Sequence, residues 1–251
     1  MLWGTAITLD VRDPTSTAEI DRLFAWFQRI DDLFSTWRSD SEISLLASEE
    51  ISRDRVSAEV DEVLNLCDRL RHESGGAFDI GVGADPRVPR REGLGPVDPS
   101  GMVKGWALER GAEMLCGEGV TNFTVNAGGD VITRGQASPG QGWRIGVQHP
   151  WQRHKVAAVV ELTDLGIATS GRYERGDHII DPRTGGPARH FMSVTVIAKD
   201  LALADGYATA AMVLGGDGLE WLSEHDGVAA MAITSDQSVI VVNDFNRYRV
   251  D

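Results

Sequence analysis

Ser193-Val-Thr-Val-Ile-Ala198, followed by Ala204-Asp205-Gly206-Tyr207-Ala208-Thr209-Ala210, is the stretch that decides the fold. The first run alternates and predicts a strand, and the second opens an Ala-, Leu- and Met-rich run that predicts a helix over 204–214. Asp205 and Thr209 are four residues apart, so they share one face of the first helical turns. They have two interpretations: hard-oxygen ligands of Mg²⁺, or an acid facing the helix dipole and a Thr bonded to a carbonyl.

The rest of the chain predicts helices and strands in mixed order. Apolar spacing predicts helices over 17–34, 57–70 and 106–115, and short helices after Ser41 and near 217–223. Alternation predicts strands over 4–12, 120–125, 131–134, 143–148, 156–162, 228–234 and 238–243, with 131–162 forming a meander. Helices interleave with antiparallel-looking strands, which favours an α+β fold, and the dinucleotide fingerprint Gly-x-Gly-x-x-Gly is absent.

Charge and hydropathy narrow the function classes. The 251 residues carry a net charge of -14, which disfavours nucleic acid as a partner. To bind an anionic small molecule, such an acidic protein would need local positive or hydrogen-bonding groups, such as a metal, a lysine or backbone N–H groups. No run of 18 apolar residues predicts a membrane span, and the first ten residues resemble no signal segment, so we expect a cytoplasmic protein without a membrane anchor. The two cysteines require no disulfide.

Several polar or aromatic residues have alternative interpretations. Trp37, in a polar loop, is either a plug of the core or a stacking surface for a planar ligand. Lys104, among small residues at a helix start, fits a phosphate cradle. His178 is either a structural hydrogen-bonding residue or a catalytic one, and it brackets a short predicted strand with Asp181. The basic cluster at 86–91 is typical of a solvated surface loop.

Short motifs follow one another along nearly the whole chain. They are Gly4-Thr5, Ser35-Thr36-Trp37, Ser41-Glu42-Ile43-Ser44, Gly75-Gly76-Ala77-Phe78-Asp79, Val103-Lys104-Gly105, Asn126-Ala127-Gly128-Gly129-Asp130, Ala168-Thr169-Ser170-Gly171, His178-Ile179-Ile180-Asp181-Pro182-Arg183-Thr184-Gly185 and Asp205 to Thr209. Each motif is weak alone, but in this order they resemble the FAD:protein FMN transferase family, also called ApbE-like proteins.

The resemblance implies a fold and a reaction. The expected fold is a single T-fold-like α+β domain over residues 1–251, with mostly antiparallel sheets and two intertwined lobes. FAD would bind between the lobes with Mg²⁺ on its pyrophosphate. The family moves FMN from FAD to a Ser or Thr hydroxyl of an acceptor flavoprotein and releases AMP. Some members instead hydrolyse FAD to FMN and AMP, and a non-catalytic FAD-binding or storage protein is a third alternative.

The resemblance also implies roles for individual residues. The expected metal ligands are Asp205, Thr209 and a backbone carbonyl placed at Gly101. His178 is the candidate general base, and Asp205 acts in catalysis through the metal. The expected FAD contacts are Trp3, Trp37, Ala77, Phe78, Asp79, Asp98, Lys104, His178 and Ile179.

The sequence departs from the family pattern at several positions. Trp3 replaces the usual Met before Gly-Thr, Ala47 replaces a common Asn, and Glu109 replaces a common Asp. The usual Thr after the aspartate is missing, since Ile80 follows Asp79. The segment 80–103 is also shorter than usual and basic, so we expect one wall of the flavin pocket to be remodelled.

Overall fold

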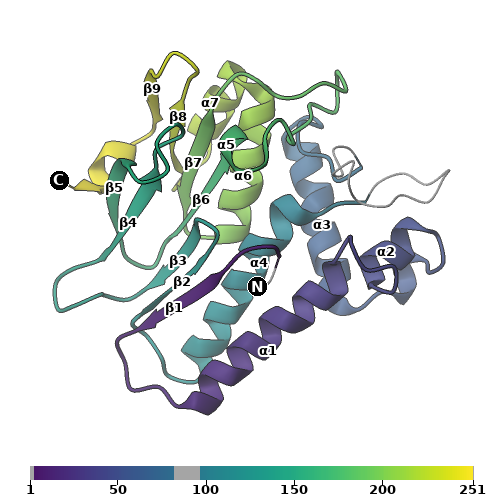
Figure 1. Ribbon diagram of the computed structural model, residues 1–251, viewed down its shortest axis with the longest axis horizontal. Helices are drawn as coiled ribbons and strands as arrows, with labels where there is room; N and C mark the ends of the chain where they lie inside the picture. Colours follow the sequence, from purple (N-terminus) through teal and green to yellow (C-terminus); the bar gives the residue numbers. More distant parts are fainter. Residues whose placement is uncertain (1–2, 82–96, 251) are drawn as a thin grey trace.

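The computed structural model describes residues 3–81 and 97–250, so the basic cluster at 86–91 lies outside the described residues (Figure 1). Within this part, no helix is long and apolar enough to cross a membrane. The helices are α1 (Thr17–Phe34), α2 (Glu42–Ala47), α3 (Ala58–Glu73), α4 (Ser100–Gly117), α5 (Arg172–Arg175), α6 (Leu201–Leu214) and α7 (Gly216–Ser223).

The strands form two sheets, and every strand pair among the described residues is antiparallel. The larger sheet has seven strands in the order β1-β2-β3-β6-β7-β8-β9, and the smaller has the order β10-β5-β4. Their bounds are β1 (Ile7–Val11), β2 (Phe123–Ala127), β3 (Asp130–Arg134), β4 (Trp143–Gln148), β5 (Val156–Leu162), β6 (Gly166–Gly171), β7 (Ser193–Ala198), β8 (Ala229–Ile233), β9 (Val239–Val242) and β10 (Arg249–Val250). The predicted α+β class with mostly antiparallel sheets is confirmed.

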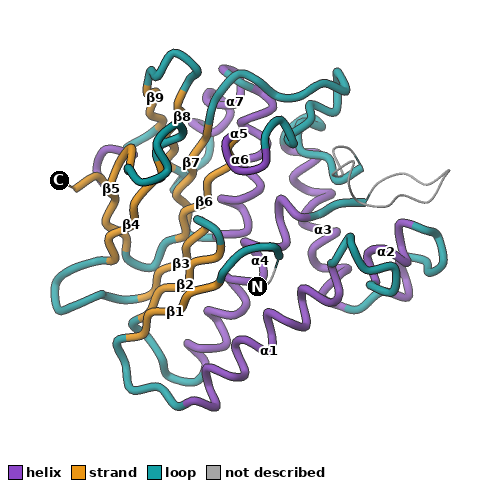
Figure 2. The backbone as a smooth tube through the Cα atoms, in the orientation of Figure 1, coloured by secondary structure: helices purple, strands orange, loops and turns teal. Residues whose placement is uncertain are grey.

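Other layers cover both faces of the central part of the larger sheet, whereas three of the four residues of the edge strand β9 are exposed. Helices α1, α3, α4 and α6 lie on one side of it, and the smaller sheet lies on the other (Figures 1 and 2). Alternation along β7 divides its side chains between two cores: Val194 and Val196 join the helix-side core, whereas Ile197 joins the core with the smaller sheet. The central strand β7 is therefore buried along its whole length.

The predicted meander over 131–162 is wrong. Strand β3 pairs with β2 and β6, whereas β4 pairs with β5 in the other sheet. The linker between β3 and β4 contains Gly135 and Gly140 in left-handed conformations, which allow the sharp turns that carry the chain from one sheet to the other.

The strand predicted between His178 and Asp181 is also absent. Ile180 makes a single bridge to Pro187. A turn follows at once, because the carbonyl of Asp181 accepts hydrogen bonds from the N–H groups of Thr184 and Gly185. Prolines at 182 and 187 have no N–H with which to extend the pairing.

Two helices begin earlier than their sequence patterns predict. Helix α6 begins at Leu201, with Asp200 as the N-cap whose side chain accepts from the N–H of Leu203. Helix α4 begins at Ser100, although glycines in its first turns weaken its helix propensity. Tertiary packing stabilises the first turn of α4. Because both helices begin earlier, Lys104 lies in the second turn of α4 and Asp205 lies in the second turn of α6.

Helices α4 and α6 approach closely at Gly105. A Cβ atom placed on Gly105 would lie 2.6 Å from the carbonyl oxygen of Leu201 and 3.0 Å from the Cβ of Asp205. The first of these atoms is backbone and cannot move aside without shifting α6. Glycine at 105 therefore sets how close the two helices come.

We predict that Gly105→Ala lowers the free energy of unfolding by about 1–3 kcal/mol or more, because the added methyl overpacks the contact between the helices. Urea denaturation followed by circular dichroism measures this change. The control is Gly117→Ala in the same helix, where an added Cβ meets no atom within 4 Å. We expect that control to be neutral or slightly stabilising, and equal losses in both variants would contradict the packing argument.

Candidate active site

Asp205 and Thr209 lie on the side of α6 that meets α4 and β6. Asp205 is 6% exposed, and its Oδ2 accepts a hydrogen bond from the backbone N–H of Gly105 at 3.2 Å. The Oγ1 of Thr209 shares a hydrogen bond with the Oγ of Ser170 at 3.0 Å. The capping acid of α6 is Asp200, so the first-turn dipole interpretation does not apply to Asp205.

Gly101 brings a third expected residue to the same place. A Cβ on Gly101 would lie 3.4 Å from the Oγ1 of Thr209 and 3.3 Å from the Cε2 of Phe78. The described residues contain no group of three or more His, Cys, Asp and Glu side chains that could hold a metal. A carboxylate, a hydroxyl and a nearby backbone carbonyl are nevertheless hard oxygen donors, and this chemistry fits Mg²⁺, which keeps positions for water and phosphate oxygens.

Lys104 makes an ion pair that the sequence analysis did not anticipate. Its Nζ lies 2.5 Å from the Oδ2 of Asp130, which is 2% exposed. The other carboxylate oxygen of Asp130 accepts from the backbone N–H of Thr169 at 3.1 Å. Asp130 follows a two-residue turn whose residues, Gly128 and Gly129, both have positive φ. The motif Asn126 to Asp130 is therefore a tight turn that ends in the partner of Lys104, and only the Gly-Gly-Asp ending of that motif indicates this in the sequence.

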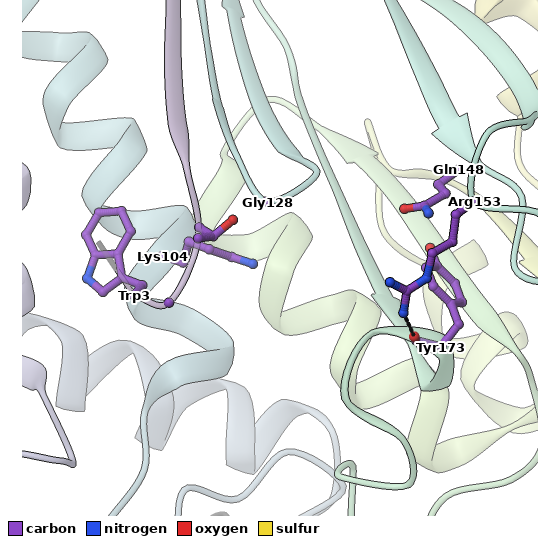
Figure 3. Close-up of a pocket in the computed structure, with 8 residues that line it drawn as sticks. Trp3, Lys104, Gly128, Gln148, Arg153 and Tyr173 are labelled. Atoms are coloured by element: carbon purple, nitrogen blue, oxygen red, sulfur yellow. Dashed lines mark hydrogen bonds between the residues drawn. The ribbon is translucent and has the colours of Figure 1, made fainter. Parts of the chain in front are cut away.

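A cavity of about 310 Å³ lies beside Lys104. In Figure 3 the ammonium group of Lys104 points toward an opposite wall formed by Gln148, Arg153 and Tyr173. The first two come from the end of β4 and the β4–β5 loop, and Tyr173 comes from α5. No sequence pattern indicates this wall, because its residues belong to no motif and come from the smaller sheet and from α5. The complete lining is Trp3, Gly4, Thr5, Lys104, Gly128, Gln148, Arg153 and Tyr173.

Trp3 lines the cavity but also belongs to the helix-side core. Its ring meets Phe27 edge-on at 5.7 Å between centroids, and its backbone N–H donates to Asp31 at 3.0 Å. Its indole Nε1 is buried and has no hydrogen-bond partner among the described residues. In Figure 3 this nitrogen lies on the side of the ring away from Lys104, so the ring faces the core and only the rest of Trp3 borders the cavity.

The remaining expected contacts divide into buried and half-buried groups. Ala77, Phe78 and Ile179 are buried in the helix-side core, so they can offer a ligand mainly backbone atoms or ring edges. Asp79 accepts from the guanidinium of Arg71 at 2.8 Å and from the N–H of Gly81. Asp98 accepts from the N–H of Ser100 at the start of α4.

Trp37 and His178 come from loops outside the α4–α6 contact: Trp37 lies between α1 and α2, and His178 lies between α5 and β7. Trp37 is 63% exposed, which excludes the core-plug interpretation and leaves its stacking role as a prediction. The Nδ1 of His178 lies 3.0 Å from the carbonyl oxygen of Gly176. This contact orients the ring if Nδ1 carries the proton, which would leave Nε2 as an acceptor.

A second cavity, of about 500 Å³, contains none of the residues expected at the site. Its side chains are Glu109, Glu113, Arg134, Asp164, Lys199 and Asp200. Glu109 has a structural role here, because it pairs with Arg134 of β3 and accepts from the N–H of Leu201 at the start of α6. Burial raises the pKa of Glu109. Glu109, which replaces the Asp common in the family, therefore connects α4 with α6 and with the larger sheet.

The architecture defines an α+β protein built on one long antiparallel sheet, and solved structures share it. It superposes on "Flavin Transferase ApbE from Vibrio cholerae" with a TM-score of 0.84 and 26% identity, covering 99% of this chain and 97% of that chain. It also superposes on the ApbE protein of Thermotoga maritima with a TM-score of 0.85 over 100% and 98% of the two chains. Identity in the second comparison is 24%, so it shows the fold alone.

The model of the ApbE family matches residues 3–88 and 85–232, and the chain belongs to that family. A curated relative, the FAD:protein FMN transferase of Vibrio cholerae, is 32% identical over 249 residues, which cover 80% of this chain and 74% of the relative. The FAD:protein FMN transferase of Klebsiella pneumoniae is 36% identical over 150 residues, which cover 56% of this chain and 43% of that protein. The resemblance noted from the motifs is thereby confirmed.

We predict that Asp130→Asn lowers the free energy of unfolding by about 2 kcal/mol or more, because it leaves the Lys104 ammonium without its buried partner. The control is Asp10→Asn, which removes an ion pair with Arg12 whose two side chains are both half exposed. We expect the control to cost below about 1 kcal/mol. Chemical denaturation of both variants measures the difference, and equal small losses would show that the Lys104–Asp130 pair contributes no more than a surface pair.

Proposed function

We propose that this protein is an FAD:protein FMN transferase that depends on Mg²⁺ and moves FMN to a Ser or Thr hydroxyl of an acceptor flavoprotein, releasing AMP. Membership of the ApbE family and the curated flavin transferases that match the chain support a transferase that uses FAD. The observation that carries the metal-dependent part is the donor set of Asp205, Thr209 and Gly101, which adjoins the Lys104–Asp130 pair through Gly105.

The charges around α4 and α6 favour a metal-dependent site. Lys104 carries one positive charge, whereas Asp130 and Asp205 each carry one negative charge, so these three side chains sum to -1. Because Asp130 already pairs with Lys104, the lysine alone cannot offset the two negative charges of a pyrophosphate. A divalent cation at Asp205 would make the local charge positive and allow the anion to bind.

In this proposal Asp205 and Thr209 hold Mg²⁺ with the carbonyl of Gly101, and Lys104 contacts a phosphate oxygen. Bound Mg²⁺ would neutralise charge on the pyrophosphate and stabilise the leaving phosphate of AMP. His178 accepts the proton of the acceptor hydroxyl, whose oxygen forms a bond to the phosphorus of the FMN half of FAD. The bond between that phosphorus and the oxygen of AMP then breaks.

The flavin contacts remain those that the motifs indicate. Trp37 offers an exposed face for stacking, and Trp3 borders the cavity beside Lys104. Ala77, Phe78 and Ile179 form an apolar surface and offer backbone atoms. Asp79 and Asp98 supply carboxylates at the edge of that surface. We further propose that residues 1–251 form one domain whose two lobes intertwine. The proposed flavin contacts are Trp3, Trp37, Ala77, Phe78, Asp79, Asp98, Lys104, His178 and Ile179.

The reaction is tested by incubating the purified protein with FAD, Mg²⁺ and a flavin-acceptor domain. The proposal expects a fluorescent acceptor band that survives denaturation, with one AMP released for each FMN attached. FMN and AMP formed at the same rate without an acceptor would instead identify an FAD diphosphatase. FAD that binds but is recovered intact would identify a storage protein.

We predict that Asp205→Asn reduces Mg²⁺-dependent transfer by at least about 100-fold, because the amide loses the charge that binds the cation. The fold should survive, since Asn is nearly isosteric and keeps an oxygen that can accept from the N–H of Gly105. Thermal melts with and without Mg²⁺ and FAD provide a second readout, in which the variant should lose the Mg²⁺-dependent stabilisation.

The control on the same helix is Asp200→Asn, because Asn is an equally good N-cap and Asp200 lies outside the proposed ligand set. It should transfer FMN and respond to Mg²⁺ as the unmodified protein does. Unchanged activity and unchanged Mg²⁺ response in Asp205→Asn would refute the metal assignment.

We predict that His178→Ala slows FMN transfer by about 10²–10⁴-fold, the usual contribution of a general base. FAD should still bind, because the ring is only one of several proposed contacts. FAD affinity, measured by flavin fluorescence, distinguishes the roles: loss of a general base should lower kcat and leave FAD affinity nearly unchanged, whereas loss of a structural residue should lower the melting temperature as well. His72→Ala, at an exposed position in the last turn of α3, is the control and should leave the rate, the FAD affinity and the melting temperature unchanged.

A further inference from the structure

One long segment of this acidic protein contains no acidic residue. The chain has 38 Asp and Glu residues, yet none lies between residues 131 and 160. That segment includes β3, β4, β5 and the β4–β5 loop, and it carries Arg134, Arg144, Arg153 and Lys155 together with His149 and His154. Arg134 pairs with Glu109, and Arg144 pairs with Glu161. The remaining basic residues all lie in the β4–β5 loop.

The β4–β5 loop, residues 149–155, is held in a defined conformation. The N–H of His149 donates to the carbonyl oxygen of Lys155 at 2.9 Å. The N–H of Lys155 donates to the carbonyl oxygen of Gln152 at 2.8 Å. The rings of His149 and Trp151 meet edge-on at 5.6 Å. These contacts present Trp151, which is 42% exposed, beside the exposed side chains of Arg153 and Lys155.

The loop also reaches the cavity beside Lys104. Arg153 lines that cavity together with Gln148, and its guanidinium donates to the carbonyl oxygen of Tyr173 at 3.4 Å (Figure 3). The acidic side chain Asp177, a few residues beyond Tyr173, is already paired with Arg172 and Arg189. The positive charge of Arg153 therefore lies at the wall of the proposed site, and Asp177 nearby is engaged with other cations.

We propose that the β4–β5 loop is the docking surface for the acceptor protein, and that it selects an acidic segment that carries the receiving Ser or Thr. Trp151 packs on that segment, while Arg153 and Lys155 pair with its carboxylates. This inference rests on the proposed function, because it names the partner of the same site. Charge complementarity carries it: a protein of net charge -14 repels an acidic partner over most of its surface, so a basic loop beside the site favours docking there.

The loop takes no part in the chemical step. The acceptor oxygen loses its proton to the general base and bonds to the FMN phosphorus, and the oxygen of AMP leaves with the electrons of the broken bond. Docking of the acceptor on the loop only raises the local concentration of its Ser or Thr hydroxyl at the cavity. Changes in the loop should therefore raise the KM for the acceptor and leave kcat nearly constant.

The test is the double variant Trp151→Ala/Lys155→Glu, neither of whose positions lines the cavity. It is assayed with an acceptor domain that the unmodified protein labels covalently with FMN. We expect the KM for the acceptor to rise about tenfold or more, since truncated aromatic anchors and reversed charges at interfaces have effects of this size. FAD affinity, measured by flavin fluorescence, and kcat should change less than about twofold. The dependence of KM on ionic strength should weaken, because one charge pair is lost.

The control is Ile240→Ala/Arg249→Glu, which also truncates one apolar side chain and reverses one cation. Ile240 is 42% exposed, as Trp151 is, and Arg249 is exposed, but neither lines the cavity. The control should keep the unmodified KM and salt dependence. Equal KM values in the loop variant and the unmodified protein would overturn the docking surface while leaving the transferase function standing.

Failure of the function itself looks different. If the unmodified protein labels no acceptor domain and only hydrolyses or holds FAD, the transferase proposal fails and the docking surface falls with it. A KM that rises equally in the loop variant and in the control would also overturn the inference, because it would show a general effect of net charge.

Discussion

The close approach of α4 and α6 at Gly105 is the contact on which the candidate site depends. Because position 105 has no side chain, its N–H reaches the buried carboxylate of Asp205 at 3.2 Å. The same approach places Gly101, one turn earlier, beside Thr209. A larger residue at 105 would separate the two helices, and the oxygen donors that come from both of them would no longer share one place.

The sheet supplies the second constraint. The tight turn between β2 and β3 presents Asp130 to Lys104, and the neighbouring strand β6 holds Asp130 through the N–H of Thr169. The pair fixes Lys104 near the α4–α6 contact, but Asp130 already balances the charge of Lys104. The balanced lysine and the buried aspartate are the basis of the proposal that an anionic ligand binds here together with a cation.

Most helices and strands follow from local patterns, and the exceptions have identifiable causes. Strands β4, β5 and β7 and helix α1 have the predicted bounds, because alternation and apolar spacing there match the buried faces. The meander failed because sheet membership depends on turns at Gly135 and Gly140, not on alternation. The start of α4 was missed because tertiary packing overrides the weak helix propensity of its glycines. Trp37 was ambiguous until its exposure excluded a core position.

The sequence by itself determined the α+β class and the family, because residue periodicity and ordered motifs are local information, and it predicts Asp205 and Thr209 as a metal pair. Asp205 and Thr209 share a helix, so their spacing alone placed them on one face. Only the tertiary structure decided which residues meet them. The contact with Gly105, the Lys104–Asp130 pair and the wall of Gln148, Arg153 and Tyr173 join segments far apart in the chain. Such contacts depend on how the helices and the two sheets pack together, and no local pattern in the sequence encodes that packing.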